Sequence, residues 1–456
     1  MGKKVIVVGG GPGGYAAALK AAQLGAEVSL CEDAQLGGTC LNVGCVPTKA
    51  LLHIGEFYRG AKLNAVPGVK ISGAELDWPA AQEHKNAVVK QFSGGVGALL
   101  RRSGVTVYNE KGVLTSGKSV KIGGKTLTAD AVIVASGSVS AALNFPGSDL
   151  PGVIDSTGAL SPPGVPCSIV IVGGGVIGVE FASLYSSLGS EVTIIELAAE
   201  ILPTVDEEIA QYAHAALESR GVRIFTGAKL AGAKKAGDSL TVSFGAGGKK
   251  QNITAEKLLI AAGRRPNTDG LGLETVGVKM TRGTVDTDEF FRTNIPGLYA
   301  VGDCNGRSML AHAAMAQGES AAEHIMGAAS RINHKIVPAC VYSSPEISCV
   351  GLTEAQVKAA GIDYAVGRFN LAGNAKAAID GSGGMVKIIA DKKLGEILGV
   401  HMIGPRVTEM IASAALCISM EGTVEDIVNT IHAHPTVSET VREAAMAVFG
   451  KALHSL

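Results

Sequence analysis

The sequence predicts an α/β protein with two parallel-sheet domains, followed by a separate α+β domain at its C-terminal end. A strand–glycine turn–helix–strand pattern occurs twice, and each copy ends in a glutamate at the same spacing from its first glycine. After about residue 335 the pattern changes to strands followed by helices, which predicts the tail. The 456 residues also exceed a single core, since one domain holds roughly 100–200 residues.

The first copy begins with a β-branched strand at 4–8, followed by the glycine-rich turn 9–14 and an Ala-rich helix. Gly25 ends that helix, and a second strand at 28–31 leads to Glu32. Short, continuous apolar strands joined by a helix are typical of a parallel sheet that is buried on both faces. We therefore expect a right-handed βαβ unit here.

The second copy repeats this order, with a strand at 169–172, the turn 173–178 and a helix that Gly189 ends. A strand at 192–195 then leads to Glu196. Both turns carry three glycines in the GxGxxG spacing, which are Gly9, Gly11 and Gly14 in the first and Gly173, Gly175 and Gly178 in the second.

This spacing, placed between a strand and a helix, predicts two Rossmann-like dinucleotide-binding units. The glycines let the backbone approach a pyrophosphate, which binds at the positive N-terminal end of the helix. The acid after the second strand binds ribose hydroxyls, so Glu32 and Glu196 are candidate ligands. The alternative is an ordinary glycine turn, against which the strand, helix and acid in the expected places argue. Glu196 also favours NAD over NADP, because a carboxylate repels a 2′-phosphate and no arginine follows closely.

Two later apolar strands, at 131–134 and 258–260, look like the ends of these two nucleotide domains. The proline-rich stretch 161–166 separates the two halves, and a further strand at 298–301 runs into Asp303. From these signals we expect four consecutive segments. The first nucleotide domain covers 1–150 and the second covers 151–268. A central segment at 269–335 completes the first nucleotide domain, and a C-terminal domain covers 336–456.

Composition excludes several classes of protein. Forty basic against 41 acidic residues leave a net charge of −1, which gives no footprint for nucleic acid or an anionic membrane. The apolar stretch 168–190 and the N-terminal segment both contain glycine clusters that argue against a membrane span or signal peptide. Eight sparse cysteines do not resemble a secreted disulfide framework, and six of them lack ligand spacing for a metal. We expect a cytoplasmic protein without a bound metal.

Cys40 and Cys45 form the one close cysteine pair, in the glycine-framed segment 37–49. Four residues separate them, so the pair is not the CxxC of zinc or thioredoxin-like sites. They can form a disulfide only if their Cα atoms come within about 7 Å. A helix N-terminus there would lower a thiol pKa and make one thiolate available. The alternative is a pair of buried structural cysteines.

His432, His434 and Glu439 near the C-terminus are candidates for acid–base chemistry. A histidine suits proton exchange with a thiol near neutral pH, and a carboxylate on its other nitrogen fixes the tautomer. The alternative is a pair of surface histidines on a loop.

The whole chain resembles the class I pyridine nucleotide–disulfide oxidoreductase family, with its motifs in order. The segment 37–49 (GGTCLNVGCVPTK) looks like the family's redox-disulfide segment, and the segment 434–439 (HPTVSE) looks like its histidine segment. The turns at 136–137, 263–267 and 300–303 and the helix start at 312–318 resemble further family motifs.

The resemblance implies that the first unit binds FAD and the second NAD, and that Cys40 and Cys45 form a redox disulfide. Cys40 would exchange with the substrate, Cys45 would face the flavin, and His434 with Glu439 would form the acid–base pair. His432 would be structural. Asp303 would bind the ribityl chain, and Lys49 and Glu180 would form an ion pair beside the flavin. Further positions that the family's cofactor motifs match are Ser136, Gly137, Gly263, Ala311 and His312.

Within the family, the His-Ala-His-Pro-Thr form and Glu196 are most similar to the branch that oxidises dihydrolipoamide on a lipoyl carrier domain. That branch implies a homodimer, and service in a 2-oxoacid dehydrogenase or glycine cleavage complex. The alternatives are a glutathione-reductase-like enzyme and a scaffold subunit without turnover. Small departures from the family are Ser136, Thr48 and Lys376, which touch substrate detail more than reaction type.

Overall fold

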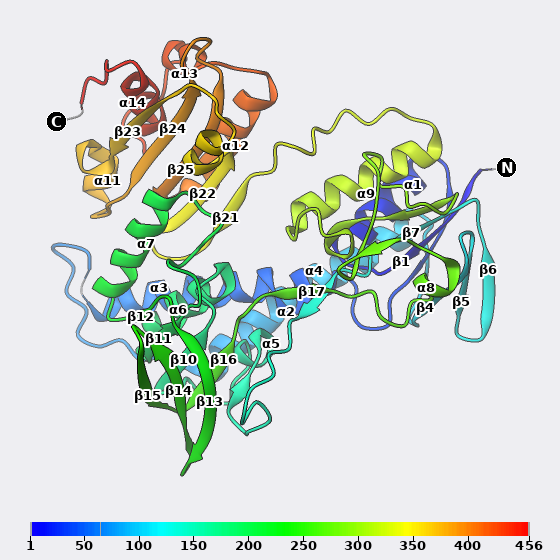
Figure 1. The fold of residues 1–456 in the computed structure, drawn as a ribbon, viewed down its shortest axis with the longest axis horizontal. Helices are drawn as coiled ribbons and strands as arrows, with labels where there is room; N and C mark the ends of the chain where they lie inside the picture. The colour runs from blue at the N-terminus through cyan, green and yellow to red at the C-terminus, as the bar shows by residue number, and fades with distance from the viewer. Residues whose placement is uncertain (1, 64, 455–456) are drawn as a thin grey trace. The chain divides into compact units, whose positions relative to one another are not determined.

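The computed structural model describes residues 2–63 and 65–454, coloured along the chain in Figure 1. The chain forms two compact units, each built from separate stretches of sequence. Unit 1 comprises the residues up to Ala50 together with Pro79–Ala142 and Gly263–His334. Unit 2 comprises Leu51–Trp78, Leu143–Ala262 and the chain from Lys335 onward. The contacts thus interleave segments, and the four consecutive domains expected above remain a prediction. Within the described ranges, no helix is both long and apolar enough to cross a membrane.

Unit 1 is built on a five-stranded parallel sheet in the order β20-β7-β1-β2-β3. Four of the five residues of β1 are buried, as expected for the central strand of a parallel sheet. The predicted strands 4–8 and 131–134 are confirmed without a shift, and the predicted strand 298–301 ends one residue earlier. The strands are β1 (Lys4–Val8), β2 (Glu27–Cys31), β3 (Thr106–Tyr108), β7 (Ala131–Val134) and β20 (Leu298–Ala300).

Helices cover this sheet, and short antiparallel pieces flank it. The meander β4-β5-β6 precedes β7, and β8 pairs with β17 although more than a hundred residues separate them in the chain. The helices are α1 (Pro12–Gln23), α2 (Gly38–Val43), α4 (Trp78–Arg102), α8 (Leu273–Val276), η1 (Gly302–Asn305) and α9 (Ala311–Met326). Helix α3 (Cys45–Lys62) begins in unit 1, and its residues from Leu51 onward belong to unit 2. The short strands are β4 (Gly112–Ser116), β5 (Ser119–Ile122), β6 (Lys125–Thr128), β8 (Ser138–Ser140), β17 (Arg264–Pro266), β18 (Met280–Thr281) and β19 (Thr284–Val285).

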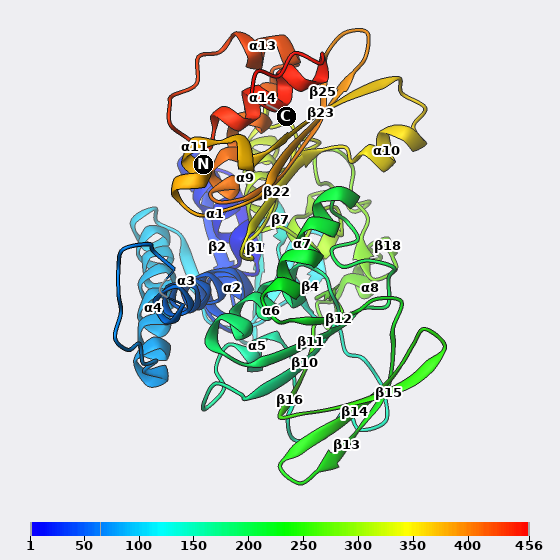
Figure 2. The same cartoon turned by 90° about the vertical axis from the view of Figure 1, so that its left-hand side faces the viewer.

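Unit 2 contains a second five-stranded parallel sheet, in the order β12-β11-β10-β16-β9. As in unit 1, an antiparallel meander precedes its last long strand, and Figure 2 shows β13, β14 and β15 as a separate ribbon. The repeat predicted from two βαβ patterns therefore extends over the whole nucleotide domain. Its elements are β9 (Val153–Ile154), α5 (Ser156–Ala159), β10 (Ser168–Val172), α6 (Val176–Leu188), β11 (Glu191–Ile195), α7 (Glu207–Ser219), β12 (Arg223–Phe225), β13 (Lys229–Ala236), β14 (Ser239–Ala246), β15 (Lys249–Ala255) and β16 (Lys257–Ile260).

The C-terminal part of unit 2 is an antiparallel sheet in the order β21-β22-β25-β24-β23, with helices packed on it. The helix predicted at 409–420 is observed as α12, which begins two residues earlier and ends one residue earlier. The strands are β21 (Ala339–Val341), β22 (Glu346–Gly351), β23 (Tyr364–Asn370), β24 (Met385–Asp391) and β25 (Ile397–Gly404). The helices are α10 (Glu354–Ala359), η2 (Leu371–Gly373), α11 (Ala375–Ile379), α12 (Val407–Ser419), α13 (Val424–Asn429) and α14 (Glu439–Val448).

A buried lysine connects α7 to this C-terminal sheet within unit 2. The Lys387 side chain on β24 is 2% exposed, and its Nζ lies 2.9 Å from Asp206, 2.7 Å from Glu208 and 2.6 Å from Glu354. Arg368 on β23 adds a second cation to Glu208, at 2.6 Å. Because a buried charge is costly without partners, three carboxylates and two cations compensate one another here.

Candidate active site

The first glycine turn combines tight packing with one open position. Gly9 has a φ of +104°, and a Cβ on Gly14 would lie 1.9 Å from the Gly9 carbonyl oxygen, so both positions require glycine. A Cβ on Gly11 would meet only the Cα of Gly38 among the described residues, at 3.8 Å. A bound group can therefore approach the backbone at Gly11, as a pyrophosphate does in such turns.

Glu32 follows this turn in space and is held by backbone amides. Its Oε2 accepts a hydrogen bond from Gly10 N at 2.7 Å, and its Oε1 accepts one from Ala34 N at 2.9 Å. Charge-assisted bonds to both oxygens fix the carboxylate beside the turn. This is the position at which the fingerprint places a ribose-binding acid.

Two helices of unit 1 begin side by side. A Cβ on Gly318 of α9 would lie 2.2 Å from the Gly13 carbonyl oxygen, so α1 and α9 pack with almost no gap. Lys20, further along α1, pairs with Glu323, further along α9, at 3.3 Å, so the two helices run in the same direction. Neither N-terminus has a side-chain cap. Their first amides can therefore bind an anion. The predicted residues Ala311 and His312 form the first turn of α9, and His312 is exposed.

Asp303 lies in η1 and is held by a chain of side chains that sequence analysis did not find. Ser138 donates its hydroxyl to Asp303 Oδ2 at 2.5 Å. Arg264 donates from Nε to the Ser138 hydroxyl at 2.8 Å and from Nη2 to the Ser138 carbonyl at 2.7 Å. The neighbouring hydroxyl of Ser136 is buried and interacts with the Cys304 thiol, which uses only part of its hydrogen-bonding capacity. A buried hydroxyl with capacity to spare and a fixed carboxylate fit a polyhydroxyl group such as the ribityl chain of FAD.

Gly137 and Gly263 flank the same strand pair. Gly137 has a φ of +70°, and Asn267 donates its backbone amide to the Gly137 carbonyl at 3.0 Å. Gly263 has a φ of +111°, and a Cβ there would meet nothing within 4 Å in the described structure, so the space beside it is open. Both glycines thus mark sharp, open turns at the ends of β8 and β17.

The second glycine turn repeats the first almost without change. Gly173 has a φ of +107°, a Cβ on Gly178 would lie 1.9 Å from the Gly173 carbonyl oxygen, and a Cβ on Gly175 would meet nothing within 4 Å in the described structure. Glu196 accepts from Gly174 N at 2.5 Å and from Ala198 N at 2.6 Å. The open glycine and the fixed acid fit a second dinucleotide.

The cysteine segment lies directly against the first glycine turn. Gly37 donates its amide to the Gly10 carbonyl at 2.8 Å, and a Cβ on Gly38 would lie 2.7 Å from the Cα of Gly11. Helix α2 therefore begins at the first fingerprint, with Cys40 as its third residue, and Cys45 begins α3.

Both cysteines are free rather than joined in a disulfide. Hydrogen bonding with Cys45, followed by burial, raises the pKa of the Cys40 thiol, while the charge of Lys49 opposes the rise. The predicted pairing of two thiols is therefore compatible with the geometry of the segment, and the interaction with Lys49 brings a cation to the pair. The alternative of two buried structural cysteines fits less well, because Cys45 is exposed and Cys40 is only partly buried.

Glu180 is 5% exposed on α6, and its Oε1 accepts the backbone amide of Tyr342 at 3.0 Å. Lys49 belongs to unit 1 and Glu180 to unit 2. The ion pair predicted between these two residues therefore remains a prediction.

The C-terminal pair is brought together. His434 Nδ1 lies 3.0 Å from Glu439 Oε2, and the side chains are 72% and 22% exposed. Glu439 is the first residue of α14, where the helix dipole favours a negative charge. His432 is separate from this pair, because its Nδ1 contacts the Thr430 carbonyl at 2.9 Å.

Asn374 is a second residue that sequence analysis missed. Its Nδ2 donates to Glu439 Oε1 at 3.1 Å and to the Thr436 carbonyl at 3.0 Å. No local sequence signal predicts these contacts, since Asn374 precedes Glu439 by 65 residues.

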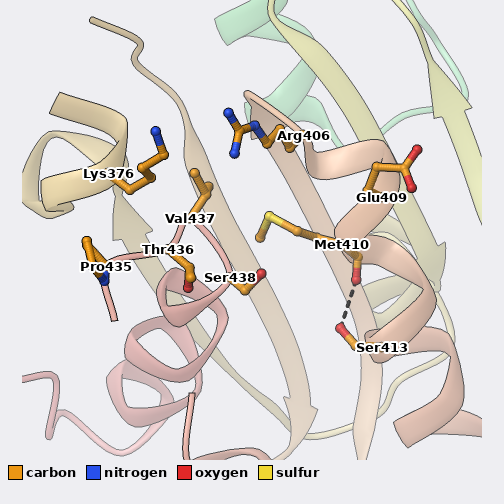
Figure 3. A pocket seen from close by; sticks show the side chains of 9 residues that line it. All are labelled: Lys376, Arg406, Glu409, Met410, Ser413, Pro435, Thr436, Val437 and Ser438. Atoms are coloured by element: carbon orange, nitrogen blue, oxygen red, sulfur yellow. Dashed lines mark hydrogen bonds between the residues drawn. The ribbon is translucent and has the colours of Figure 1, made fainter. Parts of the chain in front are cut away.

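A pocket of about 370 Å³ adjoins this segment (Figure 3). The four residues between His434 and Glu439 form one wall, and α12 forms the other. Lys376 and Arg406 both lie at one end in Figure 3, and both pair with Asp380, at 2.6 and 3.6 Å. The lining residues are Lys376, Arg406, Glu409, Met410, Ser413, Pro435, Thr436, Val437 and Ser438.

Among the described residues, no group of three His, Cys, Asp or Glu side chains is arranged to hold a metal ion. The arrangement in unit 1 instead combines a dithiol, a nucleotide-type glycine turn and an anchored acid. The arrangement in unit 2 combines a second nucleotide-type turn with a histidine–carboxylate pair. Together these groups can exchange a disulfide, move a proton and hold two dinucleotides.

Comparison with known proteins agrees with this chemistry. The model of the family "Pyridine nucleotide-disulphide oxidoreductase" matches residues 3–318, and the model of its dimerisation domain matches residues 337–445. The chain belongs to the pyridine nucleotide-disulphide oxidoreductase family. It is a flavoprotein disulfide oxidoreductase, as the sequence predicted, and the predicted combination of α/β nucleotide domains with a C-terminal dimerisation domain is confirmed.

Several relatives within this family cover nearly the whole chain. Mitochondrial dihydrolipoyl dehydrogenase from Pisum sativum is 41% identical over 99% of this chain and 92% of its own length. Dihydrolipoyl dehydrogenase from Geobacillus stearothermophilus is 41% identical over 99% of this chain and 97% of its own length.

Among solved structures, LpdA from Mycobacterium tuberculosis has a TM-score of 0.89 at 28% identity, covering 97% of this chain and 99% of that one. The HOCl-induced flavoprotein disulfide reductase RclA from Escherichia coli has a TM-score of 0.87 at 28% identity, with the same coverage.

Proposed function

We propose that this family member oxidises dihydrolipoamide, carried on a lipoyl domain, to lipoamide and passes the two electrons through Cys40 and Cys45 to FAD and then to NAD. The observation that carries the dithiol chemistry is the position of the two cysteines: Cys40 lies in the first turn of α2 and Cys45 begins α3, and α2 starts against the first glycine turn. The choice of substrate is supported by full-length relatives named dihydrolipoyl dehydrogenase at 41% identity. The choice of NAD is supported by Glu196.

In this proposal the enzyme begins the reaction with Cys40 and Cys45 joined as a disulfide. His434 Nε2 accepts a proton from a substrate thiol, and the resulting thiolate attacks Cys40 Sγ. The Cys40–Cys45 bond breaks, and Cys45 leaves as a thiolate. The second substrate thiol then attacks the substrate sulfur of the mixed disulfide, the bond to Cys40 Sγ breaks, and lipoamide is released. The proton of that second thiol passes to Cys40, so the two electrons remain in the reduced pair, with Cys40 as a thiol and Cys45 as a thiolate. Glu439 stabilises the imidazolium that forms on His434.

The residues that would hold FAD are those of unit 1. The N-termini of α1 and α9 would bind its pyrophosphate, Glu32 its adenosine ribose, and Asp303 its ribityl chain, with Ser136 and Gly137 alongside. When bound, FAD supplies two-electron transfer between the dithiol and NAD. In unit 2, Gly175 would let the pyrophosphate of NAD approach the backbone, and Glu196 would bind its adenosine ribose. We also propose that Lys49 and Glu180 pair beside the flavin.

The proposed assembly is a homodimer, supported by the match to the family's dimerisation domain. Service in a 2-oxoacid dehydrogenase or glycine cleavage complex is proposed from the lipoyl substrate. A second candidate is a stress-type disulfide reductase, which the similarity to RclA favours. Glu196 and the 41% identity to dihydrolipoyl dehydrogenases favour the first candidate.

The test is a panel of thiol and disulfide substrates, each assayed with NAD(H) and NADP(H). We expect dihydrolipoamide with NAD to give by far the highest kcat/KM. Cys45→Ser and His434→Gln should each remove this activity, whereas Cys167→Ser, at an exposed cysteine outside the site, should retain it. Faster turnover of glutathione disulfide, or of NADPH with any disulfide, would contradict the proposal.

A further inference from the structure

Asn374 lies buried at the start of α11, with 4% of its surface exposed, and its side chain bonds in two directions. Its Oδ1 accepts the Ala377 amide at 2.9 Å, which caps the helix. Its Nδ2 donates to Glu439 Oε1 at 3.1 Å and to the Thr436 carbonyl at 3.0 Å. One amide group therefore ties α11 to the segment that joins His434 to Glu439.

These bonds leave Glu439 with both oxygens in use. Oε2 contacts His434 Nδ1 at 3.0 Å, and Oε1 accepts from Asn374. The last torsion of a glutamate is broad and roughly two-fold, so one bond alone would leave the carboxylate plane loosely defined. The second bond, from Asn374, fixes that plane and so directs Oε2 at the imidazole.

Packing cannot supply this orientation, because the His434 side chain is 72% exposed. Its ring is held by the bond to Glu439 and by the backbone that carries it. Asn374 acts on that backbone too, since it binds the Thr436 carbonyl, and Thr436 donates its hydroxyl to the Ala433 carbonyl at 2.7 Å. Both supports of the ring thus depend on the same amide.

We propose that Asn374 is a positioning residue for the reaction: it holds Glu439 so that the proton of neutral His434 stays on Nδ1 and Nε2 is left to accept the substrate proton. The proposal rests on the function proposed above. Asn374 touches neither substrate nor cofactor in it, and acts through Glu439 and Thr436.

The chemistry at this position needs an acceptor and a donor together. An N-cap alone requires only an acceptor, for which serine and aspartate serve about as well as asparagine. Asn370 illustrates the simpler role, because its Oδ1 accepts the Ala372 amide at 2.9 Å on the exposed surface. Asn374→Ser and Asn374→Asp therefore keep an acceptor for the cap of α11. Serine ends one bond short of the position of Nδ2, and an ionised aspartate has no donor and also places a negative charge against Glu439.

The variants are tested in two reactions of the FAD-loaded dimer. Dihydrolipoamide oxidation needs His434, whereas NADH oxidation by ferricyanide does not. For Asn374→Ser we expect kcat with dihydrolipoamide to fall on the order of 10-fold. This is less than the about 10²–10⁴-fold rate increase that a positioned base supplies, because the base is still present but less well oriented. Asn374→Asp should lose more. KM, flavin content and ferricyanide activity should stay near wild type, and Asn370→Ser, the matched control, should change neither reaction.

Two further measurements separate positioning from folding. In a Glu439→Gln background, Asn374→Ser should add little further loss, because residues acting through one another are not additive. The pH–rate profile of Asn374→Ser should also shift, and that of Asn370→Ser should not. Equal losses in both reactions, or full additivity with Glu439→Gln, would overturn the inference.

Failure of the proposed function looks different. If the wild type does not oxidise dihydrolipoamide, that function fails whatever the variants do. The inference is then judged by ¹⁵N spectra of labelled histidine, with His434→Gln to assign the signal. Wild type should carry the proton of neutral His434 on Nδ1, and Asn374→Ser should show a mixture of both tautomers. Identical spectra would reject the positioning role with any substrate.

Discussion

The Ser138 hydroxyl lies 2.5 Å from the Asp303 carboxylate and donates a hydrogen bond to it, so a serine on β8 sets the direction of an acid on η1. Arg264 holds that serine by two further bonds. The proposed ligand of the FAD ribityl chain is thus positioned by a serine and an arginine that lie more than 30 residues from it in the chain.

Ser138→Ala should therefore weaken FAD binding. A hydrogen bond to a charged group contributes about 1.5–3 kcal/mol, and a loss at the lower end weakens affinity roughly 10-fold. The measurement is FAD titration of the apoprotein by flavin fluorescence. Ser140→Ala, on the same strand, should bind FAD as wild type does, and an equal effect of both variants would refute a specific role for Ser138.

Replacement of Glu196 should change nicotinamide preference. Both of its oxygens accept backbone amides in the second nucleotide unit, which holds a negative charge where a 2′-phosphate would lie. Glu196→Arg removes that repulsion and adds a bidentate phosphate donor, so the NADPH to NADH ratio of kcat/KM should rise at least roughly 10-fold. Glu191→Arg, at the other end of β11, serves as the control and should leave the ratio unchanged.

A mixed dimer should reveal whether two chains share a site. The proposed reaction needs Cys40 and His434, which lie in different units of one chain. Cys40→Ser and His434→Gln should each be nearly inactive as homodimers. If each chain gives its histidine to its partner's cysteines, an isolated mixed dimer has one intact site and roughly half of wild-type activity. Background activity alone in that mixed dimer would exclude sharing.

Acid should weaken unit 2 through Glu208. Its hydrogen bond from Arg368, aided by Lys387, lowers the pKa of Glu208 from 4.5 to about 2. A carboxylate whose pKa is lower in the folded state than in the unfolded state stabilises the folded protein. For Glu208 this contribution is fully present above pH 4.5 and is lost as the pH falls toward about 2. The free energy of unfolding lost in Glu208→Gln should therefore be largest above pH 4.5 and shrink below it. Urea unfolding at several pH values measures this, and Glu207→Gln, at the exposed neighbour, should show no such dependence.

The strands that the sequence predicted best are the central ones of the parallel sheets. Residues 4–8 and 131–134 form continuous apolar runs bounded by glycine or polar residues, and such runs are buried on both faces. The meander β13–β15 was not predicted, because its edge strands are mostly exposed and rich in lysine and polar residues. They form a sheet through antiparallel pairing with β14, which their own residue pattern does not indicate.

The candidate site was predicted by its reacting groups and missed by its supports. Cysteines, histidines and glycine turns have spacings that carry chemical meaning along the chain. Asn374, Ser138 and Arg264 act across 65 to 165 residues of sequence, and their meaning exists only once the chain has folded. Hydrogen bonds of this kind leave no periodic trace in the sequence.

The two nucleotide units have the same backbone geometry at their glycine turns, because a Cβ on Gly14 and one on Gly178 would lie equally close to the turn. This geometry contacts only the phosphates, so it cannot by itself distinguish a flavin dinucleotide from a nicotinamide dinucleotide. The choice between the two cofactors must therefore depend on the segments that differ between the two units, such as the cysteine-containing helix α2 after Glu32. Redesign of cofactor choice should accordingly graft the segments that follow Glu32 and Glu196, and leave both glycine turns untouched.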